Sequence, residues 1–437
     1  MKILIYGMNY APELTGIGKY SAEMAESLVA LGHDVRVVCA PPYYPDWRVA
    51  QGFSGWRYSR QAQAGVDVWR GPVWVPKTPG GATRMVHLVS FAISSFPVVL
   101  RQVLWRPDAV VAVAPSLMNA PVAWFSARLA RASAWLHIQD FEVDAAFGLG
   151  MLKGGRLKRV ALSIERLLMQ RFDVVSTISR KMIERAASKG VSPRKLFAFP
   201  NWVDIDTIFP LEKPSEMRIE LDIPTSATVV LYSGNMGAKQ GLEVLAAAAV
   251  SLANREDIVF VFCGNGPTKK VLMNQCEGLR NCRFVSLQPI ERLNTLLNLA
   301  DIHVLPQRAD AADLVMPSKL TGMLASGRAI VAMAQAGTEL HDVVAPRGVV
   351  VPPEQLEPLA NALIALASDS ARRAKLGEEA RAYAVSALSR DAVIGDFDAR
   401  LRALHPEYTR QMEREGGDQQ QTRKPTAVAL HADRSDR

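Results

Sequence analysis

Cysteine is scarce and scattered in this 437-residue chain. The cysteines form no C-x-x-C pair, which argues against a zinc site or a redox dithiol and fits a reducing compartment. Residues Met1–Gly7 predict a strand and lack the basic and then apolar pattern of a signal peptide, so we expect a cytoplasmic protein. The four cysteines are Cys39, Cys263, Cys276 and Cys282.

Convincing metal ligands are lacking as well. Two acid-x-acid pairs, Glu142–Asp144 and Asp204–Asp206, have side chains of the kind that bind a divalent cation. Asp204 lies at the predicted hinge between two domains, where helix capping or a hinge hydrogen bond is the preferred interpretation. We therefore expect no metal and no other cofactor.

Acidic residues are few in the N-terminal half. Residues 1–200 contain 25 Lys and Arg against 13 Asp and Glu, whereas the remainder contains 26 against 30. The excess is concentrated in the block Lys153–Arg159. It indicates an anionic partner for this half, either a membrane or a nucleic acid, although a solvated basic face is the alternative for the block alone.

A long apolar run is present at Met85–Trp105. A transmembrane helix needs about 20 apolar residues, but charged, polar and proline residues interrupt this run. We interpret it as a helix or helix pair in the membrane interface; a buried helix of an α/β domain is the main alternative. A full span is disfavoured because it would separate strands of one sheet. We thus expect an anionic membrane surface as partner, and no nucleic acid. The interrupting residues are His87, Pro97, Arg101 and Gln102.

Strand-like and helix-like runs alternate along the chain, which predicts α/β architecture with parallel sheets. Two such series, divided near Pro200–Asp204, predict two doubly wound, Rossmann-like domains at residues 1–200 and 201–405. Residues 406–437 are predicted to be a polar, disordered tail. Helices are expected at Tyr20–Leu31, Leu157–Gln170 and Lys181–Lys189. The expected strands are Ile3–Tyr6, Val35–Cys39, Ala109–Val113, Ala134–Ile138, Val174–Ile178, Val229–Leu231, Val259–Cys263, Cys282–Val285, Ile302–Leu305 and Ile330–Met333.

The stretch Tyr232–Leu242 combines a strand end, three glycines and the start of a helix. This geometry aims free backbone N–H groups at an anion, and Lys239 adds a positive charge beside the helix start. We predict a diphosphate cradle without the G-x-x-x-x-G-K-[ST] spacing of a P-loop; a turn that only reverses the chain is the alternative. The residues assigned to the cradle are Gly234, Asn235, Gly237, Lys239 and Gly241.

Three other segments resemble phosphate-binding turns. Gly264–Pro267 follows a strand and is predicted to face the same cleft. Pro317–Leu320 would begin a helix and contact a phosphate or ribose, or merely cap that helix. Gly16–Gly18 lacks the third glycine of a dinucleotide fingerprint, so a loop reaching a phosphate, or a plain turn, is expected instead of nicotinamide binding. The candidate residues in these segments are Gly16, Gly18, Gly264, Gly266, Ser318 and Lys319.

Acidic residues follow the strand Ala134–Ile138 at the sheet edge where parallel sheets bind ligands. Asp140, Glu142 and Asp144 could position or deprotonate an acceptor hydroxyl, or one of them could cap the next helix. Asp140 is the preferred catalytic candidate because it is nearest to the strand.

Together these motifs resemble those of GT-B glycosyltransferases of the retaining family four, especially the bacterial exopolysaccharide (colanic-acid-type) branch. The resemblance extends from residue 1 to about residue 405. Each motif alone is weak, but their order and spacing are specific. The matching segments are Asn9–Glu13, Gly16–Gly18, Gln139–Asp140, Pro200–Asp204, Tyr232–Asn235, Lys239–Gly241, Cys263–Pro267, Pro317–Leu320 and Ala325–Gly327.

The resemblance implies two Rossmann-like domains that face each other across a cleft. Residues 1–200 would bind the acceptor and carry a membrane-facing surface, and residues 201–405 would bind a nucleotide-sugar. The glycine turns and Lys239 would hold the leaving diphosphate without a metal. Asp140 would orient the acceptor, and Gln139 and Glu142 would lie on the acceptor side.

Several positions depart from the pattern of this family. Asn235 stands in place of a phosphate-binding arginine, Gln240 in place of a lysine and Gln139 in place of a histidine. The Glu-x₇-Glu pair of the family is also missing, since Leu314 and Gly322 occupy its two positions.

We therefore expect a cytoplasmic retaining hexosyltransferase, peripheral on the inner face of the plasma membrane. It would move a hexose from a UDP- or GDP-sugar to a polyprenyl-diphosphate-linked saccharide in exopolysaccharide or lipopolysaccharide O-antigen biosynthesis. One alternative is a soluble nucleotide-sugar epimerase on the same fold. The other is an inactive glycosyltransferase-like subunit that anchors a partner at the membrane.

Overall fold

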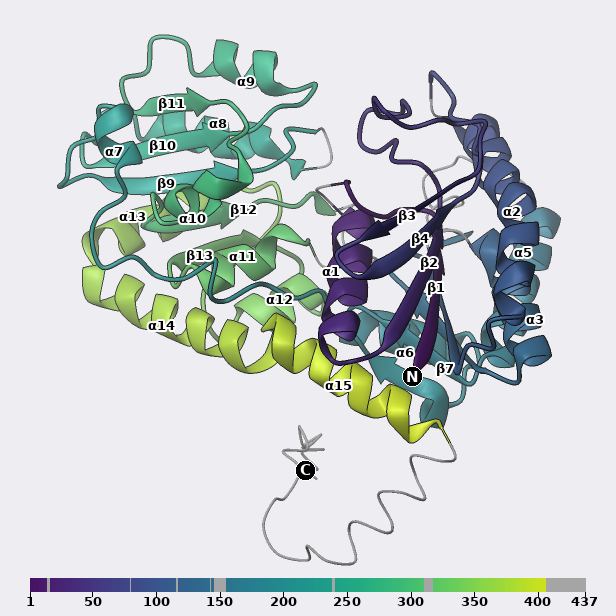
Figure 1. Ribbon diagram of the computed structural model, residues 1–437. Coiled ribbons are helices and arrows are strands. Elements are labelled where there is room, and N and C mark those ends of the chain that lie inside the picture. The colour runs from purple at the N-terminus through teal and green to yellow at the C-terminus, as the bar shows by residue number, and fades with distance from the viewer. Residues whose placement is uncertain are drawn as a thin grey trace, which may run out of the picture.

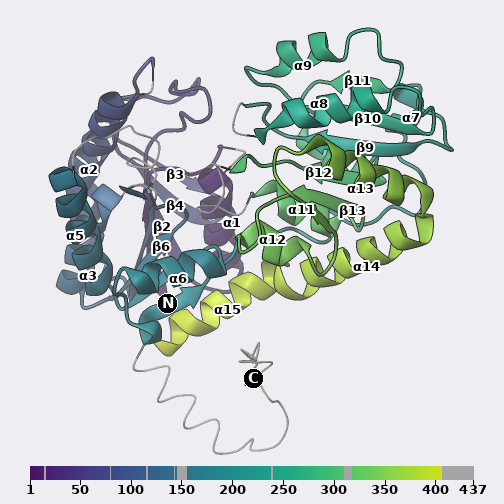
Figure 2. The same cartoon turned by 180° about the vertical axis from the view of Figure 1, so that it is seen from behind.

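The computed structural model describes residues 1–13, 16–78, 80–114, 117–141, 143–144, 155–237, 240–309 and 317–405. Two parallel sheets, each covered by helices on both faces, lie side by side (Figure 1, Figure 2). This arrangement confirms the predicted α/β class with two doubly wound parallel sheets. Among the predicted features, Lys239, Glu142, Leu314, part of Lys153–Arg159 and the tail at residues 406–437 lie outside the described residues.

The first sheet is built from the N-terminal half of the chain. Its elements are β1 (Lys2–Gly7), α1 (Gly16–Ala30), β2 (Asp34–Cys39), β3 (Ser59–Gln63), β4 (Val66–Arg70), α2 (Gly81–Val103), β5 (Ala109–Ala114), α3 (Ala120–Ala130), β6 (Ser133–Ile138), α5 (Gly155–Arg171), β7 (Val174–Thr177), α6 (Arg180–Ser188) and β8 (Leu196–Ala198). The strand order is β3-β4-β2-β1-β5-β6-β7-β8, and only the β3–β4 pair is antiparallel. The order in which strands are added reverses between β1 and β5: β2, β4 and β3 lie on one side of β1, and β5 to β8 lie on the other.

The second sheet is parallel throughout, in the order β11-β10-β9-β12-β13-β14. Its switch point lies between β9 and β12, the place where ligands bind in such sheets. Its elements are α7 (Met217–Glu220), β9 (Thr228–Ser233), α8 (Leu242–Ser251), β10 (Ile258–Cys263), α9 (Lys269–Gln275), β11 (Cys282–Val285), α10 (Leu293–Leu297), β12 (Ile302–Leu305), α11 (Lys319–Ala325), β13 (Ala329–Met333), α12 (Glu339–Val344), β14 (Val349–Val351), α13 (Leu356–Ser368), α14 (Ser370–Ala387) and α15 (Arg390–Ala403).

All the predicted strands are present, but the sequence patterns do not predict β3, β4, β8 or β14. β3 is an edge strand with an exposed, polar sequence, so it lacks the apolar run by which the other strands are recognised. It pairs with β4 through a tight turn at Ala64 and Gly65, whose φ angles are 47° and 80°. Positive φ at both central residues is typical of the turns that join hairpin strands.

The last helix, α15, returns to the first sheet (yellow in Figure 1). Its Phe397 ring stacks on Phe199 with centroids 4.5 Å apart, and its Asp398 carboxylate is 2.8 Å from His33 Nε2. Residues 390–405, within the predicted second domain by sequence, are thus packed against residues of the first half of the chain.

The apolar run at Met85–Trp105 forms one helix, α2, which contains Pro97. Its segment Thr83–Val103 is long and apolar enough to cross a membrane by length and composition, and 28% of the 18-residue window is buried. Leu88, Phe91 and Val99 pack into the core of the first sheet. Since β4 and β5 on either side belong to one sheet, α2 lies along the face of that sheet.

Candidate active site

Two glycine turns follow the neighbouring strands β9 and β10 and interlock. Gly234, Gly264 and Gly266 have φ angles of 139°, 145° and 155°. A Cβ atom on Gly264 would collide with the carbonyl oxygen of Gly234, and one on Gly266 with that of Met236. The Met236 amide donates to the Asn265 carbonyl at 2.8 Å. The glycines therefore permit close approach of two backbones, which form one platform at the carboxyl edge of the second sheet.

The side chain of Lys319 lies beside this platform. Its Nζ donates a hydrogen bond to the Tyr232 hydroxyl at 3.2 Å and lies 4.3 Å from the centre of that ring. A Cβ on Gly234 would come within 3.5 Å of Nζ. Burial lowers the pKa of Lys319 to about 8. Among the described residues no carboxylate pairs with Lys319, so its charge can serve an anionic ligand.

Tyr232 also belongs to this site, although it is not among the site residues predicted from the sequence. Its ring is fully buried at the end of β9, and its hydroxyl donates to the Asn235 carbonyl at 2.6 Å. Burial raises the pKa of Tyr232, so the hydroxyl stays protonated. Tyr232 thus holds both the glycine turn and Lys319. A tyrosine where an apolar strand meets a glycine turn is the signal that could have identified it.

Three further candidate residues lie at helix starts: Gly237 and Gly241 before α8, and Ser318 before α11. Gly241, with a φ of 64°, precedes α8, and a Cβ there would be 3.3 Å from Arg308 Cγ. A Cβ on Gly237 would be 2.9 Å from Gln240 Oε1, a buried atom with no hydrogen-bond partner among the described residues. Ser318 is exposed at the start of α11, and its side chain accepts no capping hydrogen bond. The predicted helix cap at Ser318 is therefore not made by its hydroxyl.

The loop after β1 contains a buried carboxylate. Glu13 is 5% exposed and accepts hydrogen bonds from Asn9 Nδ2 at 2.9 Å and from the Tyr43 amide at 3.1 Å. Burial raises the pKa of Glu13. A Cβ on Gly18 would lie 2.6 Å from Glu13 Oε2, so this glycine makes room for the carboxylate. Gly16, by contrast, is exposed with a φ of 63° at the start of α1.

At the carboxyl end of β6, Gln139 is anchored inward. Its Nε2 lies 3.0 Å from His137 Nε2, and His137 Nδ1 lies 2.9 Å from Ser176 Oγ. Burial lowers the pKa of His137 to about 3, so the ring is neutral and the Gln139 amide can donate to it. The next residue, Asp140, is partly exposed. This network fixes the backbone that carries Asp140.

Asp144 and Asp204, which were also considered as site residues, pair with groups of the protein. Asp144 pairs with Arg185 at 2.9 Å and with Lys189 at 3.0 Å. Asp204 accepts from the backbone amides of the two residues at 206 and 207, each at 3.1 Å, and pairs with Arg390 at 3.0 Å. Asp204 therefore caps a turn and forms an ion pair at the predicted hinge. No group of three or more metal-ligating side chains occurs among the described residues.

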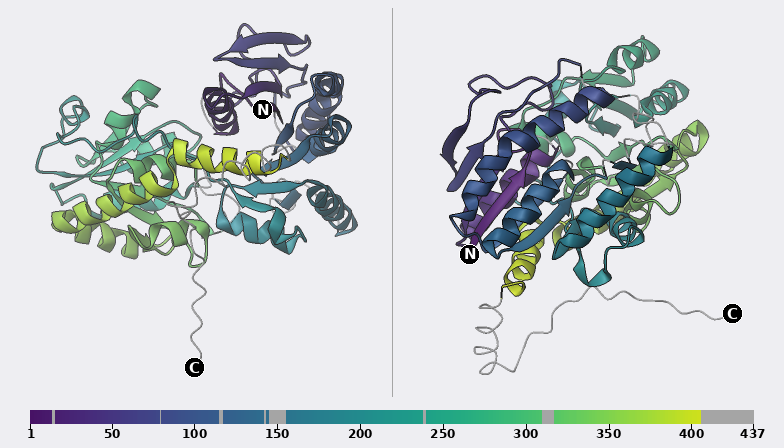
Figure 3. Two further views of the ribbon diagram at one scale, coloured as in Figure 1. Left: turned by 60° about the horizontal axis from the view of Figure 1, so that its bottom comes forward. Right: turned by 90° about the vertical axis from the view of Figure 1, so that its right-hand side faces the viewer.

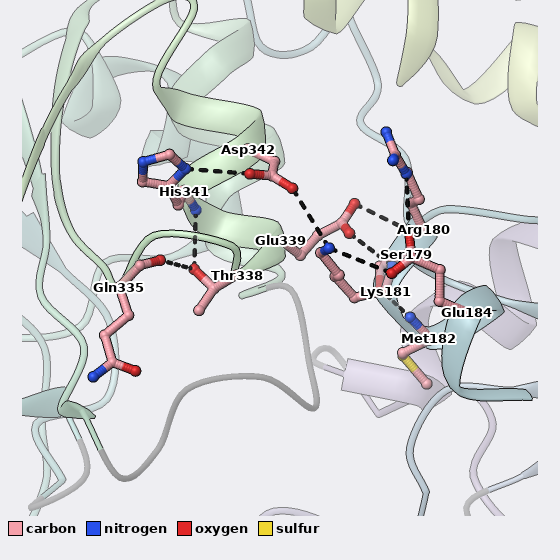
Figure 4. A network of polar contacts seen from close by, with 10 residues as sticks. All are labelled: Ser179, Arg180, Lys181, Met182, Glu184, Gln335, Thr338, Glu339, His341 and Asp342. Atoms are coloured by element: carbon pink, nitrogen blue, oxygen red, sulfur yellow. Dashed lines mark hydrogen bonds and ion pairs between the residues drawn. The ribbon is translucent and has the colours of Figure 1, made fainter. Parts of the chain in front are cut away.

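The two halves of the chain contact each other at the starts of α6 and α12. Glu339, which begins α12, accepts the backbone N–H groups of Arg180 and Lys181 at the start of α6, at 3.3 and 2.9 Å (Figure 4). The Lys181 ammonium group is 3.9 Å from Asp342. A cavity of about 360 Å³ adjoins these contacts. It is lined by Phe141, Lys181, Met182, Glu184, Arg185, Ser188 and Gly337. Asp140 is thus one residue away from a cavity bounded by both halves.

Comparison with known proteins agrees with this geometry. Residues 15–202 match the family "Glycosyl transferase 4-like domain", and residues 227–369 match "Glycosyl transferases group 1". The colanic acid biosynthesis glycosyl transferase WcaI of Escherichia coli is 44% identical over 407 residues, covering 91% of this chain and 98% of that protein. The glycosyltransferase WbjE of Pseudomonas aeruginosa is 26% identical over 47% of this chain and 54% of its own length.

Solved structures share the fold at low sequence identity. Sucrose-phosphate synthase from Thermosynechococcus elongatus superimposes with a TM-score of 0.71 at 18% identity, covering 92% of this chain and 98% of that one. HepE of Anabaena, solved in complex with UDP, has a TM-score of 0.67 at 16% identity, covering 92% and 100%. WaaG, a glycosyltransferase involved in lipopolysaccharide biosynthesis, has a TM-score of 0.61 at 17% identity, covering 90% and 98%.

These likenesses confirm the predicted family and the predicted GT-B fold. WcaI matches over nearly the whole length of both proteins, and the two family matches fall on the two sheets in the expected order. The chain therefore belongs to the group 1 glycosyltransferases and is a GT-B glycosyltransferase homologous to an enzyme of colanic acid biosynthesis.

Proposed function

We propose that the enzyme transfers a hexose, with retention of anomeric configuration, from a UDP- or GDP-sugar to a polyprenyl-diphosphate-linked saccharide in exopolysaccharide or O-antigen biosynthesis. The observation that carries the proposal is the Lys319 ammonium group, which lies beside Gly234 at the switch point of the second sheet without a carboxylate partner among the described residues. Two similar proteins support it, since HepE has been solved in complex with UDP-glucose and WcaI is a glycosyl transferase of colanic acid biosynthesis.

The leaving group would be stabilised by the second half of the chain. When the glycosidic bond of the donor breaks, negative charge develops on the nucleoside diphosphate. The ammonium of Lys319, which Tyr232 holds beside Gly234, is in place beforehand and needs no reorganisation as this charge appears. The amides of Gly234 and Gly264 already donate to backbone carbonyls of the neighbouring strands, so these glycines would act by allowing close approach of the diphosphate. Lys239 would add a second cation, and Gly16 and Gly237 would provide amides from neighbouring loops.

The acceptor would be held by the first half of the chain. Asp140 follows β6, adjacent to the cavity that residues of both sheets line. Its carboxylate would orient the acceptor hydroxyl, and Gln139 and Glu142 would lie on the same side. We place the enzyme in the cytoplasm, peripheral on the inner face of the plasma membrane, because a lipid-linked acceptor would be presented there. Residues 1–200 would act as the acceptor domain and 201–405 as the donor domain.

Calorimetric titration with UDP, GDP and their sugars tests the proposal. Lys319→Ala should weaken nucleoside-diphosphate binding roughly 10- to 150-fold, the effect of losing one charge-assisted contact. The control is Lys270→Ala, which removes an exposed lysine of α9. Unchanged affinity in a folded Lys319→Ala protein would exclude Lys319 from the donor site.

The same titration should depend on pH with a defined sign. Since the pKa of Lys319 is lowered to about 8, the free enzyme loses this charge as the pH rises through 8. The affinity of the wild type should then fall by up to tenfold per pH unit above 8, while that of Lys319→Ala stays flat. Product analysis by NMR distinguishes the alternatives: an α-anomer made from an α-linked donor indicates retaining transfer, and an epimerised nucleotide-sugar indicates the epimerase. Donor binding without any turnover indicates the inactive subunit.

A further inference from the structure

Three neighbouring helices, α2, α3 and α5, cover one face of the first sheet (Figure 3, right panel). Two of them, α2 and α5, bury polar side chains. On α2, His87 Nδ1 bonds to the Trp74 carbonyl and Ser95 bonds to the Tyr6 hydroxyl, at 2.6 Å each. Gln102, also fully buried, accepts from Arg36 at 3.0 Å. The inner side of a helix that packs on a sheet is normally its apolar side. α2 departs from this rule, because these three polar side chains are buried on its inner side.

α5 shows the same reversal more strongly. Its single acidic residue, Glu165, is 3% exposed and forms an ion pair with Lys189. Val160, Ile164 and Leu167 lie on the opposite side and are 56%, 52% and 52% exposed. Positions i, i+4 and i+7 form one stripe of an α-helix, so these side chains make a continuous apolar ridge that faces solvent.

Together the three helices expose a broad apolar surface, which we call the outer face. α3 contacts both α2 and α5, so their apolar residues adjoin. An apolar surface on this scale in a folded protein marks an interaction site. The exposed apolar residues of the outer face are Val86, Val89, Ile93, Phe96, Phe125, Leu129, Val160, Ile164 and Leu167.

The charge on these helices has one sign. α2 has two basic residues, α3 one and α5 five, whereas the only acidic residue on the three helices is the buried Glu165. Four of the basic residues are at the ends of the apolar stripes on α2 and α5: Arg84, Arg101, Arg156 and Arg171. Beside them, Arg128 of α3 pairs with the partly exposed Asp173 that follows α5. An apolar surface whose helices carry basic residues and no exposed acid matches an anionic lipid surface. A second copy would oppose basic residues to basic residues in a two-fold interface.

We propose that the outer face docks flat on an anionic bilayer, with the side chains around Ile93 and Ile164 inserted into the interface. This inference deepens the proposed function, because it names the surface that meets the membrane carrying the acceptor. It also orients the enzyme. α5 follows β6, so the basic start of α5 is on the edge where Asp140 lies. The cavity beside Asp140, where the acceptor would bind, would then open close to the lipid headgroups.

Vesicle binding with residue-specific labels tests the docking. Ile164→Cys and, as a matched control, Val271→Cys are labelled with an environment-sensitive fluorophore; Val271 is 65% exposed on α9 of the second sheet. Vesicles of phosphatidylglycerol and phosphatidylethanolamine should shift the emission of the label at 164 to the blue and leave that at 271 unchanged. Vesicles of phosphatidylcholine should give a weaker response, because each basic residue near an anionic surface contributes about fivefold in binding.

Co-sedimentation measures the energetics of the same contact. Ile93→Ser with Ile164→Ser should lower binding to the anionic vesicles at least tenfold, whereas Ile219→Ser, which alters an 86% exposed residue of α7, should not. UDP titration by calorimetry shows whether each variant is folded and keeps its donor site, and so separates failure of docking from failure of the proposed function. The proposal would be overturned if the double variant sedimented with vesicles to the same extent as the wild type, or if the labels at 164 and 271 showed equal emission shifts. So would a dimer in light scattering that the double substitution dissociates, because the face would then bind a second copy.

Discussion

Two helices, one on each sheet, differ in the kind of side chain that they bury. On the second sheet, α13 buries Leu359, Leu363 and Leu366 against the core, as expected of a helix between a sheet and water. On the first sheet, α5 buries Glu165 and exposes Ile164. Both helices belong to parallel doubly wound units, so topology does not cause the difference. The partner of the buried side chain does: Lys189 pairs with Glu165 on the inner side of α5.

The glycines of the two halves also make room for different groups. In the second half, Gly264 permits two backbone turns to touch. In the first half, Gly18 permits a buried carboxylate, that of Glu13, to approach a helix. The glycine turns of the second half therefore form a backbone surface, whereas the loop of the first half is built around a buried side chain. Substitutions in the two halves should accordingly affect different steps of the reaction.

Asp140→Asn should have the largest effect. We expect kcat to fall about 10²–10⁴-fold with little change in the donor dissociation constant, because a positioned carboxylate contributes through the acceptor hydroxyl. Steady-state kinetics combined with calorimetric titration of the donor separate the two quantities. Asp46→Asn, at an exposed position of the same half, is the matched control. Turnover at the wild-type rate in Asp140→Asn would mean that this residue only caps the following segment.

Gly264→Ala should have the next largest effect and should lower the stability of the second half of the chain. The added Cβ meets the Gly234 carbonyl at a φ of 145°, so we expect a loss of about 3 kcal/mol in the free energy of unfolding. Gly278→Ala is a strict control, since its φ is 76° and no atom lies within 4 Å of the new Cβ; about 1 kcal/mol is expected there. Urea unfolding measures both. Equal losses would show that strain alone, rather than contact between the turns, requires Gly264.

Glu339→Gln should have the smallest effect, because it alters a single contact between the halves. The carboxylate accepts two amide hydrogen bonds at the positive start of α6, a contact of about 1 kcal/mol at a partly exposed site. We expect a change in KM for the acceptor of up to about fivefold, with stability nearly unchanged. Glu184→Gln, whose carboxylate pairs with Arg180 and Lys181 on the same helix, is the control. A larger effect of Glu184→Gln would show that the contact between halves is unimportant.

Much of the proposed donor side was predictable because its signals are local. The strand, glycine turn and helix around Gly234 lie within eleven consecutive residues, and the structure shows β9 and α8 on either side as expected. The contact of Lys319 with Tyr232 joins residues 87 positions apart, which no local pattern contains. The assignment of Gly18 to a phosphate loop did not include Glu13, because the need for that space appears only when the loop folds back on α1.

The sequence by itself determined the class of fold, because strands covered on both faces must be apolar throughout and therefore stand out from the helices between them. It also determined the place of the glycine turns, which depends on neighbours in the chain. Only the tertiary structure decided which side of α5 faces outward. An amphipathic pattern has two sides and does not indicate which of them meets the sheet. Here Lys189, which lies 24 residues away on a different segment, forms an ion pair with Glu165 on the inner side of α5. Ile164 is therefore on the outer side.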